Sequence, residues 1–220
     1  MNRLNECIEG TCSAGKIYRD KMSIKYTKEY QSWTSKNEKH WKYYLAGFWE
    51  REGSITVSFK AHEACKTGFY IDPEVSLTQN VDGIHLLFWA KCYFRNGKVN
   101  LKSGTTNVWV YSMTNRQSIV ENFIPFFEKY MLPWTGKRKT FETFKEINTR
   151  FERKDHHSLE GSKEIARLAY QMNSTEGEEQ KYTLPQILAL MDQSYAIHSY
   201  RKAFFLPKGF CPFGTPEGKN

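Results

Sequence analysis

The segment "YLAGFWEREGS", Tyr44–Ser54, decides how the rest of the chain is interpreted. Apolar residues recur at helical spacing through it, which predicts an amphipathic helix that ends at Gly53. This apolar stripe comprises Trp41, Tyr44, Leu45, Phe48 and Trp49, and its next position is Glu52. A carboxylate at a helix C-terminus faces the negative end of the helix dipole, at a cost of up to about 1 kcal/mol. A bound divalent cation would remove that cost, whereas an ordinary exposed glutamate at a frayed helix end is the alternative.

The same helix carries two small residues, Ala46 and Gly47, side by side. A glycine inside a helix costs about 1 kcal/mol relative to alanine, so its presence there favours a close approach by another helix. Glu50 lies two positions before Glu52 and therefore does not share its face. The stretch favours a helix that packs against a second helix, and both interpretations of Glu52 stay open on spacing alone.

Alternating strands follow the helix at once. In "SITVSFK", Ile55, Val57 and Phe59 point to one side and the polar residues to the other. Two helix–strand–strand blocks and two further helices give the predicted order helix, two strands, helix, two strands, helix, helix. Pro73 predicts an edge or bulged position in the second strand. The outward polar residues are Ser54, Thr56, Ser58, Lys60, Glu74, Ser76, Lys98, Asn100 and Lys102. Such a β-ribbon fits the DNA major groove, although any half-exposed antiparallel sheet alternates in this way.

Length and charge narrow the class of protein. The 220 residues carry a formal charge of +8, and 40% of them are hydrophobic, which predicts a folded chain with a polyanionic partner. An acidic membrane surface is the competing partner, but no apolar run approaches the roughly 18 residues that a membrane span needs. The predicted organisation is an N-terminal arm (1–38), a core (39–152) and a C-terminal helical extension with a tail (153–220).

Five scattered cysteines, an odd number, favour reduced thiols over a disulfide framework. His62 with Cys65, or Cys7 with Cys12, offers half of a zinc site, and neither pair has a convincing second half. The first residues, "MNRLNECIEG", resemble neither a signal peptide nor a transit peptide, so we expect a chain that stays where it is made or has lost a leader.

Taken together, these stretches resemble the LAGLIDADG homing endonucleases. "LAGFWEREG" (45–53) matches the nine-residue motif of that family, with glutamate at both acidic positions, and "EVSLTQNVDG" (74–83) resembles its second strand. "TNRQSIVENFIPFFEKY" (114–130) is similar to its late helix. The resemblance covers about residues 39–152 and is strongest to the one-motif, homodimeric branch encoded by group I introns in organellar ribosomal RNA genes.

The resemblance implies an α+β fold, an αββαββα core whose antiparallel sheet curves into a saddle. It implies a site-specific double-strand DNA endonuclease that uses Mg²⁺ (or Mn²⁺), hydrolyses one phosphodiester per strand and leaves short 3′ overhangs. Glu52 matches the metal ligand, Gln79 the residue that positions water or metal, and Lys137 or Lys139 the basic residue near the scissile phosphate. The polar strand residues named above would contact DNA. The homodimer interface would include Leu45, Ala46, Gly47, Phe48 and Glu50.

The same resemblance implies an organellar protein, in a chloroplast first and a mitochondrion next, with neither a membrane nor a small-molecule substrate as partner. Two alternatives use the same fold: a maturase that helps its intron splice, and a DNA-binding regulator that does not cleave. Glu52 together with Gln79 favours the nuclease, because loss of the acidic residue at position 52 would have pointed to the other two.

Overall fold

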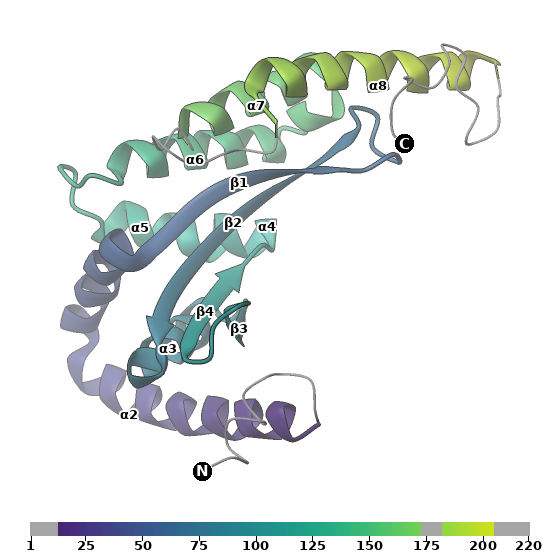
Figure 1. The fold of residues 1–220 in the computed structure, drawn as a ribbon. Helices are drawn as coiled ribbons and strands as arrows, with labels where there is room; N and C mark the ends of the chain where they lie inside the picture. Colours follow the sequence, from purple (N-terminus) through teal and green to yellow (C-terminus); the bar gives the residue numbers. More distant parts are fainter. Residues whose placement is uncertain (1–12, 173–181, 205–220) are drawn as a thin grey trace. The chain divides into compact units, whose positions relative to one another are not determined.

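The computed structural model describes residues 13–172 and 182–204 (Figure 1). Its elements follow one another as α2 (Ser13–Glu52), β1 (Gly53–Ala61), β2 (Phe69–Asn80), a 3₁₀ turn (Val81–Gly83), α3 (Ile84–Phe94), β3 (Lys98–Leu101), β4 (Val108–Met113), α4 (Arg116–Ser118), a π-helical turn (Ile119–Phe123), α5 (Ile124–Tyr130), α6 (Arg138–Glu152), a second 3₁₀ turn (Asp155–His157), α7 (Leu159–Met172) and α8 (Leu184–Phe204). This order of helices and strands confirms the predicted α+β fold.

The four strands form one antiparallel sheet in the order β1-β2-β4-β3. β2 pairs with β4 from Val75, opposite Met113, to Asn80, opposite Val108. Pro73 therefore precedes the part of β2 that pairs with β4, and its missing N–H removes no bond from that ladder. The predicted edge strand is wrong, because β2 lies between β1 and β4; the proline is accommodated before the part of β2 that pairs with β4.

The chain divides into two compact units, and the first contains residues 1–56 and 73–145. Its core is built on Trp49, which is fully buried. The ring centroid of Trp49 lies 5.8 Å from that of Phe94, 6.0 Å from Tyr111, 5.1 Å from Phe123 and 5.7 Å from Phe127, all at steep angles. Edge-to-face aromatic pairs of this kind add about 0.5–1.5 kcal/mol each beyond area burial. The C-terminal turn of α2 is therefore fixed by aromatic packing.

The N-terminal part of α2 is helical from Ser13, where the sequence predicted a loosely packed arm. The helix kinks at Asn37, whose φ of −129° and ψ of 30° are not helical. Before the kink, Tyr26 stacks on Phe88 with a centroid distance of 5.4 Å, and Trp33 stacks on Trp89 at 5.4 Å. This segment is therefore packed against α3.

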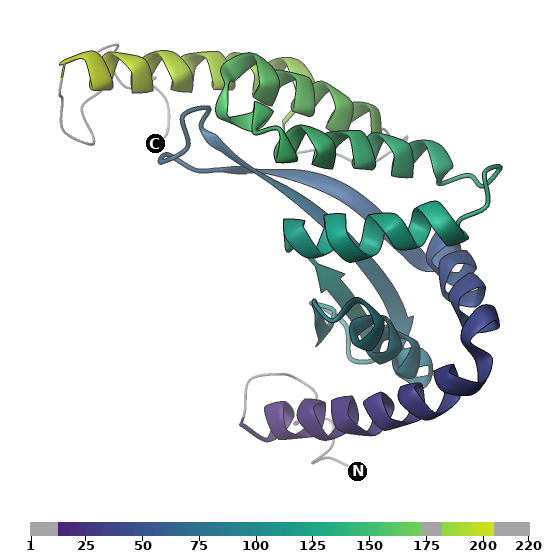
Figure 2. The ribbon, with the colours of Figure 1, turned by 180° about the vertical axis from the view of Figure 1, so that it is seen from behind.

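The second unit contains residues 57–72 and 146–220. The far half of the β1–β2 hairpin packs there against α7, with the centroid of Phe59 6.4 Å from Phe69 and 6.1 Å from Tyr170. α7 and α8 lie side by side (Figure 2). The predicted C-terminal extension thus shares a unit with the tip of the hairpin.

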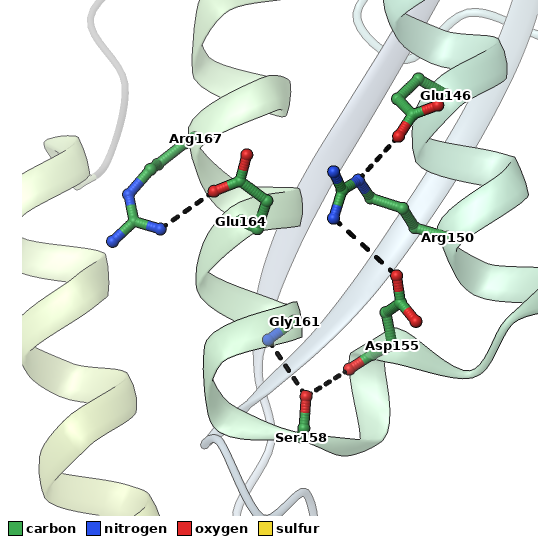
Figure 3. A network of polar contacts seen from close by, with 7 residues as sticks. All are labelled: Glu146, Arg150, Asp155, Ser158, Gly161, Glu164 and Arg167. Atoms are coloured by element: carbon green, nitrogen blue, oxygen red, sulfur yellow. Dashed lines mark hydrogen bonds and ion pairs between the residues drawn. The ribbon is translucent and has the colours of Figure 1, made fainter.

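A polar network organises the turn between α6 and α7 (Figure 3). Arg150 Nε contacts Glu146 Oε1 at 2.9 Å, and its Nη1 lies 3.8 Å from Asp155 Oδ2. Ser158 Oγ donates to the carbonyl oxygen of Asp155 at 2.9 Å and accepts from the N–H of Gly161 at 3.1 Å. A Cβ on Gly161 would lie 2.1 Å from that carbonyl oxygen, so this close approach requires glycine.

Candidate active site and nucleic-acid interface

The C-terminal half of α2 divides its apolar residues between two rows. Trp41, Leu45 and Trp49 are 4%, 3% and 0% exposed and form the row that faces the core. Tyr44 is 55% exposed and stacks on the half-buried Phe48 at a centroid distance of 6.0 Å. Glu52 follows Tyr44 and Phe48 at steps of four residues and is exposed. The prediction that Glu52 continues a buried stripe is wrong, because the row to which it belongs faces out of the chain.

Gly47 lies beside this outer row and opens onto free space. A Cβ built on Gly47 would have no heavy atom within 4 Å. Leu45 and Ala46, at 3% and 2% exposure, are enclosed by the chain's own core. They have little surface to offer a second helix, so the surface available for one runs through Tyr44, Gly47 and Phe48, with the half-buried Glu50 further along.

Lys137 closes the end of α2. Its Nζ donates to the carbonyl oxygen of Trp49 at 3.3 Å and to that of Gly53. The Trp49 carbonyl belongs to the last turn of α2, where partial negative charge collects, and the Gly53 carbonyl belongs to the first residue of β1. Burial lowers the pKa of Lys137, whereas the carboxylates of Glu50 and Glu52 act to raise it. The structure therefore brings Lys137 and both acidic residues of the motif together, and the ammonium group offsets the helix dipole that Glu52 faces.

Gln79 and Lys139 have different surroundings. Gln79 is half-buried near the end of β2, opposite Trp109. Its side chain lies against Gly83, on which a Cβ would meet Gln79 Oε1 at 2.4 Å. The side chain of Lys139 is exposed, and its backbone carbonyl accepts a bond from Thr143 Oγ1. Of the two predicted lysines, Lys137 is the one with recorded contacts to the end of α2.

The strand face shows the predicted alternation. Ser54, Thr56 and Ser58 are exposed in β1, between the buried Ile55 and Val57. In the first unit, Ser76, Ser112 and Lys98 lie side by side on β2, β4 and β3. Thr78, Val110 and Asn100 form a second row of the same kind. These two cross-strand rows add Ser112, Thr78 and Val110 to the expected surface, and the alternation in "VWVYSM" was the signal for the two residues from β4.

Four predicted surface residues differ from the rest, and one of them is Ser76, which is half-buried. Lys60 Nζ forms an ion pair with Asp72 Oδ2, so its charge is already partly compensated within the second unit. Glu74 is half-buried, and Lys102 is exposed just beyond the end of β3. Lys98 and Asn100 are exposed and lie on either side of the buried Val99. Lys98 is therefore an exposed lysine of the sheet with no ion pair to a carboxylate in the described part of the chain.

A divalent cation fits the end of α2 only in part. Within the described ranges, no group of three or more His, Cys, Asp or Glu side chains could hold a metal ion. Glu52 offers an exposed carboxylate, the hard oxygen ligand that Mg²⁺ prefers, and Mg²⁺ sites often need only one or two carboxylates with phosphates and water. The remaining ligands would come from outside the chain.

The alternative zinc ligands do not assemble in the part of the chain that is described. His62 Nδ1 lies 3.8 Å from Cys65 Sγ, and no third His, Cys, Asp or Glu joins them there. Cys7 and Cys12 lie outside the described residues. None of the described helices combines the length and apolar character required to cross a membrane.

Comparisons with known proteins agree on one family. The sequence profile described as LAGLIDADG endonuclease matches residues 45–148. The chain is similar to DNA endonuclease I-CeuI of Chlamydomonas moewusii, with 33% identity over 162 residues, which are 73% of this chain and 72% of that protein. The structure of the group I intron-encoded homing endonuclease I-CeuI complexed with DNA superposes with a TM-score of 0.67, at 26% identity and covering 84% of this chain and 95% of the other. The archaeal intron-encoded homing endonuclease I-Vdi141I complexed with DNA gives 0.66, at 30% identity, with 71% and 98% covered.

Proposed function

Because the chain belongs to the LAGLIDADG endonuclease family, a family of site-specific DNA endonucleases, we propose that it cleaves both strands of a DNA target as a divalent-metal-dependent homodimer. The observation that carries this proposal is the end of α2. There an exposed carboxylate, Glu52, lies on an open helix row beside Gly47, while Lys137 donates to the carbonyl oxygens of Trp49 in α2 and of Gly53 just after it.

Glu52 holds the cation in this proposal, and Mg²⁺ (or Mn²⁺) is the ion that suits a carboxylate with phosphate oxygens. When bound, such an ion lowers the pKa of water and stabilises charge on the leaving oxygen. Gln79 orients the attacking water through its amide. Lys137 keeps a positive charge beside the reacting phosphate, where charge builds up in the transition state.

Lys137 has hydrogen-bonding capacity for both tasks. An ammonium group has three protons, and two are directed at the carbonyl oxygens of Trp49 and Gly53. The third remains for a phosphate oxygen. Lys137 is therefore a better candidate than Lys139 for the basic residue, and its position is fixed by the same helix end that carries Glu52.

The homodimer follows from the incomplete metal site. One chain supplies one motif, and a second copy placed across the outer row of α2 would bring a second Glu52 to the same end of the helix pair. Gly47 allows the backbones to approach closely, while Tyr44 and Phe48 would be covered. The contact would be isologous, with the same surface used by both copies. Two copies carry 2 × (+8) = +16 of formal charge, which suits a long duplex.

Double-stranded DNA is the proposed substrate, bound along the polar strand face. Lys98, Asn100, Ser76 and Ser112 lie in adjoining positions of the ladder, where Lys, Asn and Ser side chains can reach base edges and phosphates. The two solved structures compared above, I-CeuI and I-Vdi141I, are complexes with DNA, which supports this assignment.

The proposed target is an intronless organellar ribosomal RNA gene, cut with short 3′ overhangs as part of intron homing, in a chloroplast before a mitochondrion. The similarity to a protein of Chlamydomonas moewusii and to a group I intron-encoded enzyme supports this choice. The choice of target does not rest on the side chains of the strands, because DNA bending and bound water also contribute to the recognition of a DNA sequence.

The test is digestion of DNA libraries that span such genes, with the cut ends mapped by sequencing. We expect one main site, cleavage that EDTA abolishes and Mg²⁺ restores, and staggered ends. Glu52→Gln is the inactive variant, and Glu50→Gln is its matched control from the same helix turn. Binding of a duplex without cleavage by the native chain would instead support the regulator, and binding of intron RNA alone would support the maturase.

A further inference from the structure

A hollow of about 800 Å³ lies between α2 and the end of α3, within the first unit. Three basic side chains line it: Lys42 from α2, and Lys91 and Arg95 from the last turn and the C-terminal cap of α3. No carboxylate belongs to its lining. Neither Lys91 nor Arg95 forms an ion pair with a carboxylate in the part of the chain that the structure describes. The hollow therefore gathers three positive charges, and no carboxylate lines it.

The dipole of α3 explains only part of this arrangement. Basic residues near a helix C-terminus gain about 0.3–1 kcal/mol from the dipole, which accounts for Lys91 and Arg95. Lys42 comes from a different helix, and its ammonium group lies 6.0 Å from the ring centroid of Trp41 and 5.8 Å from that of Tyr130, so the dipole of α3 does not account for its position. Arg95 also adopts a left-handed backbone, with φ of 53°, where glycine or asparagine fits better. A large cationic side chain thus occupies a position that its backbone does not favour.

Trp41 provides an independent observation. It lines the hollow and is 4% exposed, and its indole Nε1 is buried without a hydrogen-bond partner. An indole N–H can only donate, and leaving a buried donor unsatisfied costs about 1–3 kcal/mol. The rings of Tyr30 and Tyr93 lie 5.4 Å and 4.9 Å from Trp41 and fix its orientation. Three other tryptophans have a buried indole N–H without a partner, but among these four residues only Trp41 lines the hollow with the basic side chains.

We propose that this hollow binds a phosphate group, whose oxygens would accept from Trp41 and pair with Lys42, Lys91 and Arg95. The group could belong to a free nucleotide or to the backbone of a nucleic acid. The hollow is on the helix-covered side of the sheet, where the hydroxyl of Tyr111 donates to the carbonyl oxygen of Asn96. In β3, the side chain of Val99 is buried, whereas those of Lys98 and Asn100 are exposed on the other side of the strand. The hollow is therefore separate from the polar strand face.

The experiment follows the indole N–H resonance of Trp41 in the full chain labelled with ¹⁵N-tryptophan. The six tryptophans give six indole signals, and Trp41→Phe identifies the one of interest. Inorganic phosphate, adenosine monophosphate, and single-stranded DNA and RNA decamers are titrated separately. We expect the Trp41 signal to move downfield with at least one of them, because its proton gains an acceptor.

The Lys91→Gln/Arg95→Gln double variant should weaken the same titration at least tenfold, while Lys129→Gln, an exposed lysine outside the hollow, should leave it unchanged. These variants change side chains at the surface, so they provide the comparison even if Trp41→Phe fails to fold. Movement with phosphate or the nucleotide indicates a small-ligand site, and movement with oligonucleotides alone indicates a backbone site. No movement with any probe, or equal movement in the double variant, would overturn the proposal. Because the readout is not cleavage, it is independent of the proposed nuclease activity.

Discussion

Glu52→Gln separates the role of the carboxylate in chemistry from its role in the fold. The substitution keeps size and hydrogen-bonding capacity but removes one negative charge from the exposed end of α2. Without that charge the helix dipole is no longer opposed, a gain of a few tenths of a kcal/mol to about 1 kcal/mol. The attraction to Lys137 is lost as well, and an exposed pair of this kind is worth about 0–1 kcal/mol. The two terms nearly cancel.

We therefore expect the free energy of unfolding of Glu52→Gln to lie within about 0.5 kcal/mol of the native value, measured by urea denaturation. Dimerisation and target binding should persist, as measured by sedimentation and gel shift. Cleavage of both strands in Mg²⁺ should fall by about 10³-fold or more, equivalent to about 4 kcal/mol of transition-state stabilisation.

Glu50→Gln is the control, and it should reduce cleavage less because Glu50 is half-buried and on a different face of the helix. A Glu52→Gln protein that cuts at a near-native rate would refute the metal-ligand assignment. A variant that loses several kcal/mol of stability would instead refute the reasoning that Lys137 and the helix dipole balance each other.

Three further substitutions test neighbouring parts of the proposal. Gly47→Ala should leave the stability of the single chain unchanged or raise it by up to about 1 kcal/mol, because the added Cβ meets nothing within the chain. The same Cβ should weaken dimerisation in sedimentation experiments. Unchanged dimerisation would exclude this helix face from the interface. Lys137→Met should lower the free energy of unfolding in urea by about 1–3 kcal/mol, because the carbonyls of Trp49 and Gly53 lose a charged donor. Lys139→Met, the control, should change that free energy by no more than about 0.5 kcal/mol. If Lys98 contacts a base, Lys98→Ala should relax specificity at one position per half-site by about 1–3 kcal/mol. If it contacts only phosphate, the substitution should weaken binding to all DNA sequences equally. A binding assay that finds neither change removes Lys98 from the DNA interface.

The sheet was the part of the structure most accessible to sequence reasoning. Ile55, Val57, Val75 and Leu77 alternate with polar residues, and a period of two assigns each strand its faces without knowledge of the rest of the chain. The ladder partners were not accessible in the same way. The alternation in β4 indicates the face of Ser112, but its position beside Ser76 and Lys98 becomes visible only when β4 is aligned with both β2 and β3.

The helices were harder to interpret, because a period of 3.6 yields several neighbouring rows. Tyr44 and Trp49 both belong to the apolar set of α2, and only the tertiary structure reveals that Trp49 faces the core while Tyr44 is 55% exposed. The docking of the N-terminal segment had a weak signal in the spacing of Tyr26, Tyr30 and Trp33, which is that of one helix face.

In the candidate site, one residue followed from a local sequence pattern, and others depended on contacts that only the tertiary structure reveals. Glu52 could be identified from the motif, since the relevant residues are adjacent in sequence. The contact of Lys137 with Trp49 and Gly53 joins positions 88 and 84 residues apart, so local spacing could not establish it. The orphaned N–H of Trp41 likewise depends on three segments meeting around one ring.

The division of the chain has a consequence for its synthesis. Residues 57–72 leave the ribosome early, yet the compact unit to which they belong is completed only by residues 146 and beyond. The far half of the β1–β2 hairpin, with Phe59 and Phe69, must therefore wait for Tyr170 and its neighbours before its apolar side is covered. During that interval the nascent hairpin has an uncovered strand face of the kind that attracts other chains. The C-terminal helices thus serve as the late-arriving cover of an early-made strand pair, and a ribosome that stops before α7 would release a chain prone to aggregate.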